Sequence, residues 1–431
     1  MTPSNQRSSR RAAAVIGAGV SGLTAAYLLQ REYDVTLFER DDRLGGHAHT
    51  HDVVTPDDRV VPIDSGFIVH NRDTYPNLIR LFVELGVETQ PSDMTMSVTC
   101  AGCGLEYSGG DGIRGVFAQP RNLTNPAFLG LLAQVSGFQR RARRLLAADG
   151  PGAGTPGITL GEFLAAGRST PYFVRHFVIP LVSAVWSCPP DTALAYPARS
   201  LFQFLDHHGV LRLTGAPKWR TVTGGSRSYV ERLVKEITAA EVGTPVRSVR
   251  RFGDGVEVRD DDDHARTFDR VVVATHADQA LALLAEPTAV ERTTLGAFTY
   301  SRNETVLHTD ASLLPRSPHA RASWNYRLRT CDGGHAGVQV SYSMNRLQRL
   351  DEPLDYVVTL NGGADIDERA VIARMLYTHP VYTSESVAAQ SGLDALNRDR
   401  LAFAGAYHGW GFHEDGCAAG VRAAHSLGVT W

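Results

Sequence analysis

The sequence contains few lysines and few cysteines. Only Lys218 and Lys235 are lysines among its 43 basic residues, so a mechanism that requires a lysine has two candidates. Five cysteines in 431 residues are few and odd in number, which argues against a disulfide framework. No apolar run approaches the roughly 18 residues that a membrane-spanning helix needs. A net charge of −3 gives no general attraction to nucleic acid, so no nucleic-acid partner is expected.

The composition and the amino-terminal residues bound the class of protein. Hydrophobic residues make up 43% of the sequence and charged residues 21%, which is typical of a globular protein. The start, MTPSNQRSSRRAAAVIGAGVSGL, superficially imitates a twin-arginine signal, because basic residues precede an apolar stretch. Its glycines stand at specific offsets and run into a helix pattern without a cleavage site. We interpret it as the first strand of a cytoplasmic protein.

A glycine motif follows this strand. Gly17, Gly19 and Gly22 form G-x-G-x-x-G between the apolar run 12–16 and a helical pattern at 23–29. The first glycine permits a tight turn, the second lets a pyrophosphate approach the backbone, and the third lets helix and strand pack closely. Glu39 ends a second strand about 20 residues on, where an acid accepts hydrogen bonds from a ribose. The context favours a dinucleotide site over a structural glycine-rich turn.

A second G-x-G-x-x-G occurs at 110–115. It follows Tyr107-Ser108-Gly109 rather than a buried strand, and no acid follows at the required distance. A surface loop is the better interpretation, so one dinucleotide site is predicted and a separate NAD(P)H domain is not.

The residues after Glu39 indicate which dinucleotide binds. They read E-R-x-x-R-x-G-G, with Arg40, Arg43, Gly45 and Gly46 at the fixed positions. This run resembles the second fingerprint of the FAD-binding amine oxidase and phytoene desaturase superfamily. The resemblance implies that the paired glycines bring the backbone against the pyrophosphate and flavin. It also implies non-covalent FAD, since no recognisable attachment motif is present.

Other segments resemble further FAD elements of that superfamily. The resemblance places the backbone around Gly66 and Phe67 beside the isoalloxazine ring, and Val246 against the adenine. It also places the helix that begins near Gly416 with its amino terminus toward the flavin. The cofactor-binding residues expected from the motif and the resemblance are Gly17, Ala18, Gly19, Val20, Ser21, Gly22, Glu39, Arg40, Gly45, Gly46, His47, Gly66, Phe67, Val246, Gly405, Phe412, His413 and Gly416.

The fold class expected is therefore α/β, with a Rossmann-like FAD-binding domain and a discontinuous α+β substrate domain. The FAD domain should comprise 12–78, 216–290 and 395–431. The substrate domain should comprise 79–215, which is mainly helical, and 291–394, which contains a sheet.

A closer resemblance covers nearly the whole chain. Gly45-Gly46-His47-Ala48, Asp64-x-Gly66-Phe67 and Ser92-Asp93-Met94 resemble the amino-terminal flavoprotein part of plant cyclopropane fatty acid synthases. They also resemble stand-alone bacterial "predicted NAD/FAD-binding" proteins. The fusion implies association with a cyclopropane-synthase-like methyltransferase, and it makes a fatty acyl chain the best substrate candidate.

Two patterns suggest metal ligands, and both have a simpler interpretation. Cys100 and Cys103 have CxxC spacing, but no second pair follows at zinc-finger distance, so ordinary thiols near a turn are expected. Three histidines on one extended strand, His47, His49 and His51, rarely enclose a tetrahedral ion, and the preceding glycines favour a cofactor loop. We expect no metal, with His47 near the pyrophosphate or flavin. His49 and His51 should face solvent or support the site from outside.

The chemistry of the site remains open between three interpretations. The resemblance implies hydride transfer from a C–H bond to flavin N5. The resemblance implies that a classical amine oxidase has a late-chain lysine beside flavin N5 and two aromatic side chains that enclose the amine. Here no lysine follows Lys235, and His413 stands where one of those aromatic residues is expected. A standard amine oxidase is therefore disfavoured but kept as an alternative. A non-catalytic accessory flavoprotein is the third possibility. His413 or Glu414 is the acid/base candidate, although an acid at a helix start is also stabilising without chemistry. The expected cavity residues are Tyr407, Trp410 and Trp324.

Overall fold

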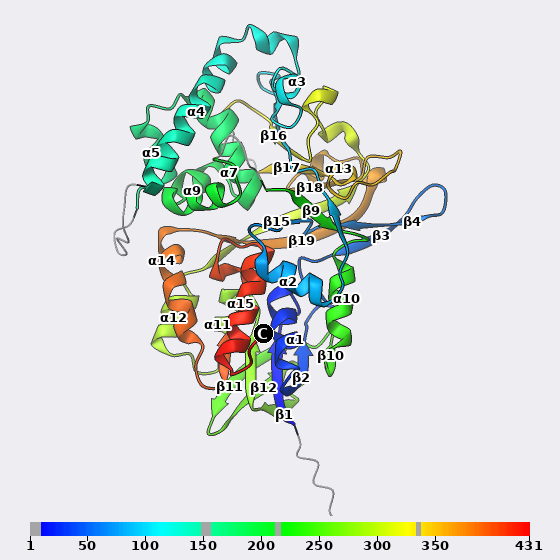
Figure 1. Ribbon diagram of the computed structural model, residues 1–431, viewed down its shortest axis with the longest axis vertical. Helices are drawn as coiled ribbons and strands as arrows, with labels where there is room; N and C mark the ends of the chain where they lie inside the picture. The colour runs from blue at the N-terminus through cyan, green and yellow to red at the C-terminus, as the bar shows by residue number, and fades with distance from the viewer. Residues whose placement is uncertain (1–9, 148–156, 212–216, 333–337) are drawn as a thin grey trace, which may run out of the picture.

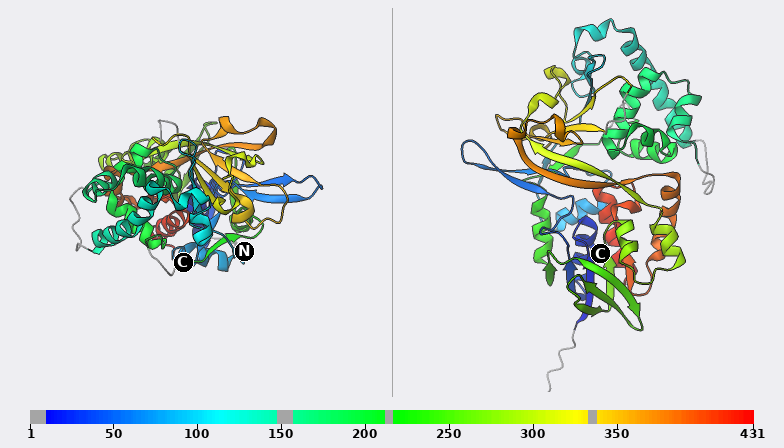
Figure 2. Two further views of the ribbon diagram at one scale, coloured as in Figure 1. Left: turned by 90° about the horizontal axis from the view of Figure 1, so that it is seen from above. Right: turned by 180° about the vertical axis from the view of Figure 1, so that it is seen from behind.

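The computed structural model describes residues 10–147, 157–211, 217–332 and 338–431. It shows two parts stacked along the longest axis, with both ends of the described chain in the same part (Figure 1). The β3–β4 ribbon (Thr50–Val54 and Val60–Asp64) projects from the side of the molecule (Figures 1 and 2). No helix in the described ranges has the length and apolar character needed to cross a membrane.

A five-stranded parallel sheet forms the centre of the part that holds the termini. Its order is β10-β2-β1-β14-β20. The strands span Ala239–Glu241, Tyr33–Phe38, Arg11–Ile16, Arg270–Val273 and Leu401–Phe403. Their apolar runs fit a sheet covered on both faces, and Ala13, Val15 and Val272 are fully buried. The predicted α/β fold with a Rossmann-like sheet is thereby confirmed.

Helices α1 (Val20–Leu29) and α15 (His413–Ser426) pack closely together against this sheet. Small residues make that contact possible, because a Cβ on Gly420 would overlap the backbone oxygen of Ser21. The remaining elements of this part are α10 (Arg227–Lys235), α11 (Ala277–Leu283), α12 (Ala289–Leu295), α14 (Ser384–Leu393) and the β11-β12-β13 sheet (Val246–Phe252, Gly255–Asp260 and Ala265–Phe268).

The other part contains a seven-stranded sheet of order β19-β15-β18-β17-β16-β7-β8. Its strands span Val371–Val381, Thr299–His308, Val357–Leu360, Gln339–Ser343, Trp324–Leu328, Met96–Cys100 and Glu106–Ser108. All neighbours are antiparallel except β16 and β7, which pair in parallel. The long strands β15 and β19 cross between the two parts (Figure 2).

A helical layer lies beside this sheet (Figure 1). The predicted helix over 126–147 is present as α4 (Pro126–Ala147), and its apolar face meets the cluster that includes Phe173 and Phe202. The other helices are α5 (Leu160–Ala166), α6 (Pro171–Phe173), α7 (Ile179–Trp186), α8 (Pro190–Ala195) and α9 (Ala198–His207). One π-helical turn, η2 (Val174–Val178), joins α6 to α7.

Sheet membership agrees with most of the predicted domain ranges. All strands of the five-stranded sheet lie in the ranges predicted for the FAD domain, and all seven of the larger sheet lie in the substrate ranges. Strand β6 (Thr89–Pro91) does not follow the predicted division. It lies in a range predicted for the substrate domain, yet it pairs with β9 (Trp219–Val222), which also pairs with β5 (Val69–Asn71), and both of these lie in ranges predicted for the FAD domain. Helix α2 (Pro76–Glu84) crosses the predicted boundary at 78, and the boundary at 215–216 lies outside the described residues. The domain division stays a prediction.

Candidate active site

The glycine motif forms the turn between β1 and α1. Gly17 adopts a φ of +99°, and a Cβ there would lie 2.8 Å from the backbone oxygen of Ala274. A Cβ on Gly22 would overlap the Gly17 carbonyl oxygen, which explains the close packing of helix on strand. A Cβ on Gly19 would instead meet open space, and this residue caps α1 without any side-chain hydrogen bond. The open space at Gly19 therefore lies beside the backbone N–H groups at the start of α1, where a phosphate would bind.

Glu39 is directed at this turn. Its carboxylate accepts hydrogen bonds from the backbone N–H of Ala18 at 2.7 Å and of Asp41 at 3.0 Å. Thr244 N–H donates to the Glu39 carbonyl at 2.8 Å, so the segment that leads into Val246 runs alongside. The structure thus places Glu39 and Val246 at the same end of the motif, while their predicted contacts with ribose and adenine stay predictions. Arg40 points outward, with its side chain 67% exposed.

The second fingerprint packs directly on the first. Gly45 N–H donates to the Ala18 carbonyl at 2.8 Å, and a Cβ on Gly46 would lie 3.1 Å from the Gly19 Cα. Two polar atoms of this loop, Arg43 Nη1 and His47 Nε2, are buried without a hydrogen-bond partner. Unpaired buried donors are costly. They flank the Gly45–Gly46 pair, whose backbone packs on the Gly19 turn, and a polar, anionic group such as the FAD pyrophosphate would give them a partner.

His47 belongs to a cluster that strand β19 completes. Its ring lies 4.9 Å from that of Tyr377 and 5.4 Å from that of His379, measured between centroids. Burial, followed by the neighbouring His379, lowers the pKa of His47 well below its ordinary value. Burial also lowers the pKa of His379 to about 4. Both imidazoles are therefore neutral at physiological pH.

His49 and His51 support this region through hydrogen bonds. His49 Nδ1 lies 2.9 Å from the Tyr377 hydroxyl, and His51 Nε2 lies 2.9 Å from Ser65 Oγ. Ser65 Oγ in turn lies 2.7 Å from the Tyr377 hydroxyl. The predicted supporting role agrees with this placement, and the three histidines 47, 49 and 51 do not converge on one point.

Asp64 anchors the turn before α10. It is fully buried, and it accepts hydrogen bonds from Thr50 Oγ1 at 2.6 Å, Ser226 Oγ at 2.8 Å and Ser226 N–H at 2.9 Å. Burial raises its pKa to about 6 in spite of these donors. A Cβ on Gly66, two residues on, would overlap the His47 carbonyl oxygen, so the two predicted flavin segments touch there.

His413 stands at the start of α15 and meets Phe67. The two rings stack with centroids 3.6 Å apart and planes at 8°. His413 Nε2 lies 2.8 Å from the Tyr229 hydroxyl. Burial lowers the His413 pKa to about 3 and raises the Tyr229 pKa well above its ordinary value. Both groups are therefore uncharged, and the histidine tautomer sets which of them donates in this hydrogen bond.

Glu414 is turned away toward another helix. Its carboxylate accepts hydrogen bonds from Asn77 N–H at 3.0 Å, Asn77 Nδ2 at 2.6 Å and Leu78 N–H at 3.0 Å. These donors belong to the first turn of α2, which is where a carboxylate is stabilising. The catalytic role predicted for Glu414 is not supported, because both of its oxygens serve this helix end. The alternative interpretation, that Glu414 stabilises a helix start, agrees with these contacts. The helix that it caps is α2, however, and not α15.

The other residues of the last segment hold α15 in place. Asp415 accepts from Phe412 N–H at 2.9 Å, and burial raises the Asp415 pKa to about 7. A Cβ on Gly416 would lie 2.7 Å from Val20 Cγ1 and 2.9 Å from Ser21 Oγ, so α15 starts against the first turn of α1. Gly405 lies against the ring of Tyr407 in the preceding turn.

The predicted cavity residues pack in different surroundings. Tyr407 is buried in the core next to Phe298, and its hydroxyl has no partner. Trp410 packs on the helical layer and lines a surface hollow of about 440 Å³ with His207 and Gln203. Trp324 lies on β16 with its ring edge-on to Tyr342. The three residues belong to different packing clusters, and their place in one substrate cavity stays a prediction.

The sequence reasoning missed the partners that arrive from distant segments. Tyr229 comes from α10, and Tyr377 and His379 come from β19. None of the motifs from which the site was predicted includes these three residues.

The second G-x-G-x-x-G was interpreted correctly as a surface loop. Residues 109–114 are exposed, and they lead into the five-residue helix α3 (Gly112–Val116).

Comparison with known proteins identifies a family. The model of the flavin containing amine oxidoreductases matches residues 20–302, which is more than half of the chain. No curated protein matches the sequence.

Solved structures share the fold over almost the whole chain. A fatty acid isomerase from P. acnes that produces CLA has a TM-score of 0.68 at 18% identity, covering 96% of this chain and 97% of its own. Cyclohexylamine oxidase from Brevibacterium oxydans has a TM-score of 0.68 at 17% identity, covering 97% and 98%. A putrescine oxidase bound to putrescine has a TM-score of 0.67 at 15% identity with the same coverage. At such identities the likeness establishes the fold alone.

Proposed function

Because the chain belongs to the family of flavin-containing amine oxidoreductases, we propose that it is an FAD-dependent oxidoreductase that desaturates or isomerises a fatty acyl chain. FAD, when bound, supplies a hydride acceptor for a substrate C–H bond. The Gly17–Gly22 turn, Glu39 and the Gly45–His47 loop would hold its dinucleotide part. The Phe67–His413 pair and the start of α15 would border the flavin.

The observation that carries the substrate class is that, among the residues the structure describes, the carboxylates near these histidines are all engaged by hydrogen-bond donors. A protonated amine needs a negative or aromatic partner when it leaves water. Asp64 and Glu414 each direct their oxygens at backbone, amide or hydroxyl donors, and Asp415 bonds to Phe412 N–H. The neighbouring imidazoles of His47 and His413 are neutral. An ammonium ion would depend on aromatic rings such as Phe67 and Tyr377 without a carboxylate, so these surroundings suit an uncharged hydrocarbon better.

Two further points favour the same substrate class. No lysine follows Lys235 in the chain, so the late-chain lysine that many amine oxidases use is missing. The fold also accommodates acyl substrates, as the fatty acid isomerase demonstrates, although a shared fold does not assign a function.

His413 is the residue we assign to proton handling. We assign His413 Nε2–H as the donor to the Tyr229 hydroxyl oxygen, which leaves the Nδ1 lone pair free to take up a proton, as in sites where one nitrogen fixes the tautomer for the other. Phe67 holds the ring plane by stacking. The neutral imidazole can then stabilise a developing charge on the substrate or take up a proton when a C–H bond breaks.

The test is anaerobic exposure of the purified flavoprotein to a substrate panel. Unsaturated fatty acids, their phospholipid esters and cyclopropane fatty acids form one arm, and putrescine and cyclohexylamine form the other. We expect loss of oxidised-flavin absorption, or a shifted double bond in the recovered lipid, only in the acyl arm. Product analysis is required because isomerisation returns the hydride and leaves the flavin oxidised.

Two alternatives correspond to defined outcomes of this panel. Reduction by amines alone would establish a flavin amine oxidase. Reaction with neither arm, together with stable binding to a cyclopropane-synthase-like methyltransferase, would establish an accessory flavoprotein and overturn the oxidoreductase proposal.

A further inference from the structure

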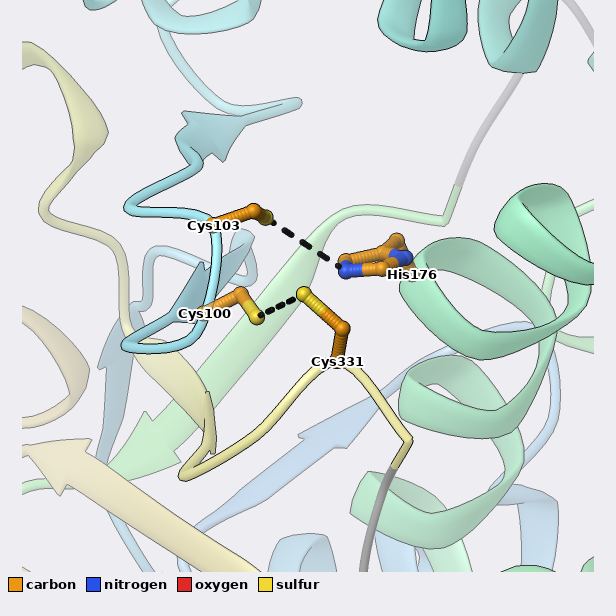
Figure 3. Close-up of side chains that lie close together, drawn as sticks. All are labelled: Cys100, Cys103, His176 and Cys331. Carbon is orange, nitrogen blue, oxygen red and sulfur yellow. Dashed lines mark hydrogen bonds between the residues drawn. The ribbon is translucent and has the colours of Figure 1, made fainter.

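Four side chains far apart in the sequence meet in the substrate part. Cys100, Cys103, His176 and Cys331 each offer one ligand atom, and these atoms all lie within 4.8 Å of one another. Figure 3 shows the three sulfur atoms and the imidazole facing a common centre, from a hairpin turn, a helix and a loop. The sequence-based expectation of two ordinary thiols rested on the lack of a second ligand pair at zinc-finger spacing. The fold supplies that pair from elsewhere.

Two distances in this thiol–imidazole cluster match those of tetrahedral coordination. Cys100 Sγ lies 3.7 Å from Cys331 Sγ, and Cys103 Sγ lies 3.7 Å from His176 Nε2. Zinc bonds of about 2.3 Å to sulfur and about 2.0 Å to nitrogen, at tetrahedral angles, place neighbouring ligand atoms about 3.5 to 3.8 Å apart. A disulfide between Cys100 and Cys331 would need their sulfurs at about 2.05 Å.

The first two ligands come from the turn between β7 and β8. Cys100 ends β7, and its N–H donates to the Leu105 carbonyl at 2.9 Å, which closes the hairpin around Cys103. Gly104 turns the chain back with a φ of +71°. Gly102 lets the turn approach the third ligand, because a Cβ there would lie 2.7 Å from the backbone nitrogen of Cys331.

His176 is oriented as a ligand. It lies in the π-helical turn η2, and such turns occur frequently at functional sites. Its Nδ1 lies 3.1 Å from the Tyr172 carbonyl oxygen, so it donates there and leaves the Nε2 lone pair directed at the thiols. The Tyr172 ring stacks on the imidazole at 4.1 Å. A backbone acceptor on the outer nitrogen is the usual support of a metal-bound histidine.

Cys331 reaches the cluster through sheet pairing. Strand β16 runs parallel to β7, with Leu328 opposite Cys100, and Ala101 N–H donates to the Leu328 carbonyl at 2.8 Å. The three residues after Leu328 then bring Cys331 over the hairpin turn. Backbone hydrogen bonds therefore place the thiols independently of any contact between the sulfur atoms.

We propose that Cys100, Cys103, His176 and Cys331 bind one Zn²⁺ ion in a structural site. Three thiolates and one imidazole suit zinc, and four protein ligands leave no position for a substrate. The ion would join the β7–β8 turn and the β16 loop to the α6–η2–α7 helix. It would thereby fasten the helical layer to the edge of the seven-stranded sheet, and it does not depend on the proposed flavin chemistry.

The first experiment uses the full-length flavoprotein without substitutions. Protein produced with zinc in the medium and purified without chelators is analysed for metal content, and its zinc X-ray absorption is measured. We expect about one zinc per chain, with three sulfur neighbours at about 2.3 Å and one nitrogen at about 2.0 Å. The proposal would be overturned by a zinc content far below one per chain after reduction and zinc addition, or by iron in place of zinc. It would also be overturned by a metal coordination shell without sulfur, or by a Cys100–Cys331 disulfide in mass spectrometry.

Substitutions then assign the ligands. Cys103→Ser alters the exposed thiol of the cluster, so it should fold normally while zinc content falls at least fivefold. Cys188→Ala is the matched control, because Cys188 is a free, buried cysteine outside the cluster and should retain zinc. Chelation should lower the unfolding temperature of the wild type more than that of Cys103→Ser, with flavin content unchanged in both. Equal zinc content in the Cys103→Ser and wild-type proteins would contradict the assignment.

Discussion

Replacing Glu414 distinguishes a positioning residue from a catalytic one. In Glu414→Ala the first turn of α2 loses a carboxylate that accepts from Asn77 N–H, Asn77 Nδ2 and Leu78 N–H at 2.6 to 3.0 Å. Loss of a cap costs about 0.5–2 kcal/mol, and each backbone donor left buried and unpaired costs about 1–3 kcal/mol. Since this helix end is only half-buried and water can reach part of it, we expect the free energy of unfolding to fall by about 2–4 kcal/mol.

The conservative variant sharpens the test. Glu414→Gln keeps one acceptor oxygen but loses the charge at the helix amino terminus, so we expect a loss of about 1–2 kcal/mol. Urea unfolding at one fixed FAD concentration measures both variants, because free ligand shifts apparent stability. Glu88→Ala, on the exposed segment after α2, is the control and should stay within about 0.5 kcal/mol of wild type.

Activity completes the comparison. A positioning role predicts that folded, flavin-loaded Glu414→Gln reacts with substrate at a rate within about threefold of wild type, which corresponds to less than about 0.7 kcal/mol. Unchanged stability combined with a hundredfold loss of flavin reduction would refute the positioning role and restore the acid/base role for Glu414.

Three further predictions concern the glycine turn, the histidine and pH. Gly19→Ala should leave the FAD-free chain as stable as wild type but lower FAD affinity at least tenfold. Gly22→Ala should instead destabilise the FAD-free chain. Thermal unfolding with and without FAD measures both effects. His413→Ala should slow anaerobic flavin reduction by about 10²-fold, while His425→Ala, on the exposed end of the same helix, should not; equal rates would exclude the assigned role. Because the folded pKa of His413 is lowered to about 3, its contribution to stability is present above the ordinary pKa of 6.5 and is lost as pH falls toward 3. Asp415, raised to about 7, acts in the opposite sense, contributing below 3.8 and losing that contribution as pH rises through 7. Between pH 6.5 and 4 the free energy of unfolding in urea should thus fall by about 3 kcal/mol less in His413→Phe than in wild type. An equal fall would contradict the pKa assignment.

The fold was predictable where local pattern decides it. The strand, glycine turn and helix at 11–29 follow from an apolar run and three glycines, and α4 follows from helical spacing at 126–147. In both segments the spacing of apolar residues matches the face that is buried in the structure, so the local sequence is sufficient to predict the element.

The site was less predictable because its contacts are not local. Glu414 accepts hydrogen bonds from residues more than three hundred positions earlier in the chain. No motif in either segment indicates that the two segments meet. The CxxC pair was interpreted without His176 and Cys331 for the same reason: these ligands converge only after β16 pairs with β7. A pattern search along one dimension cannot detect ligands that meet through tertiary structure.

The order of strands in the five-stranded sheet has a consequence for the synthesis of the chain. Strand β14 lies between β1 and β20, so one edge of this sheet is missing until residues 401–403 have left the ribosome. At 5–20 residues per second, the interval between the emergence of β14 and of β20 is roughly 10 s. During it, the apolar edge of β14 has no strand partner, and α15 is not yet available to cover α1. The nascent chain therefore exposes apolar surface of the sheet and of α1 during that interval, and the sheet is complete only once β20 has emerged.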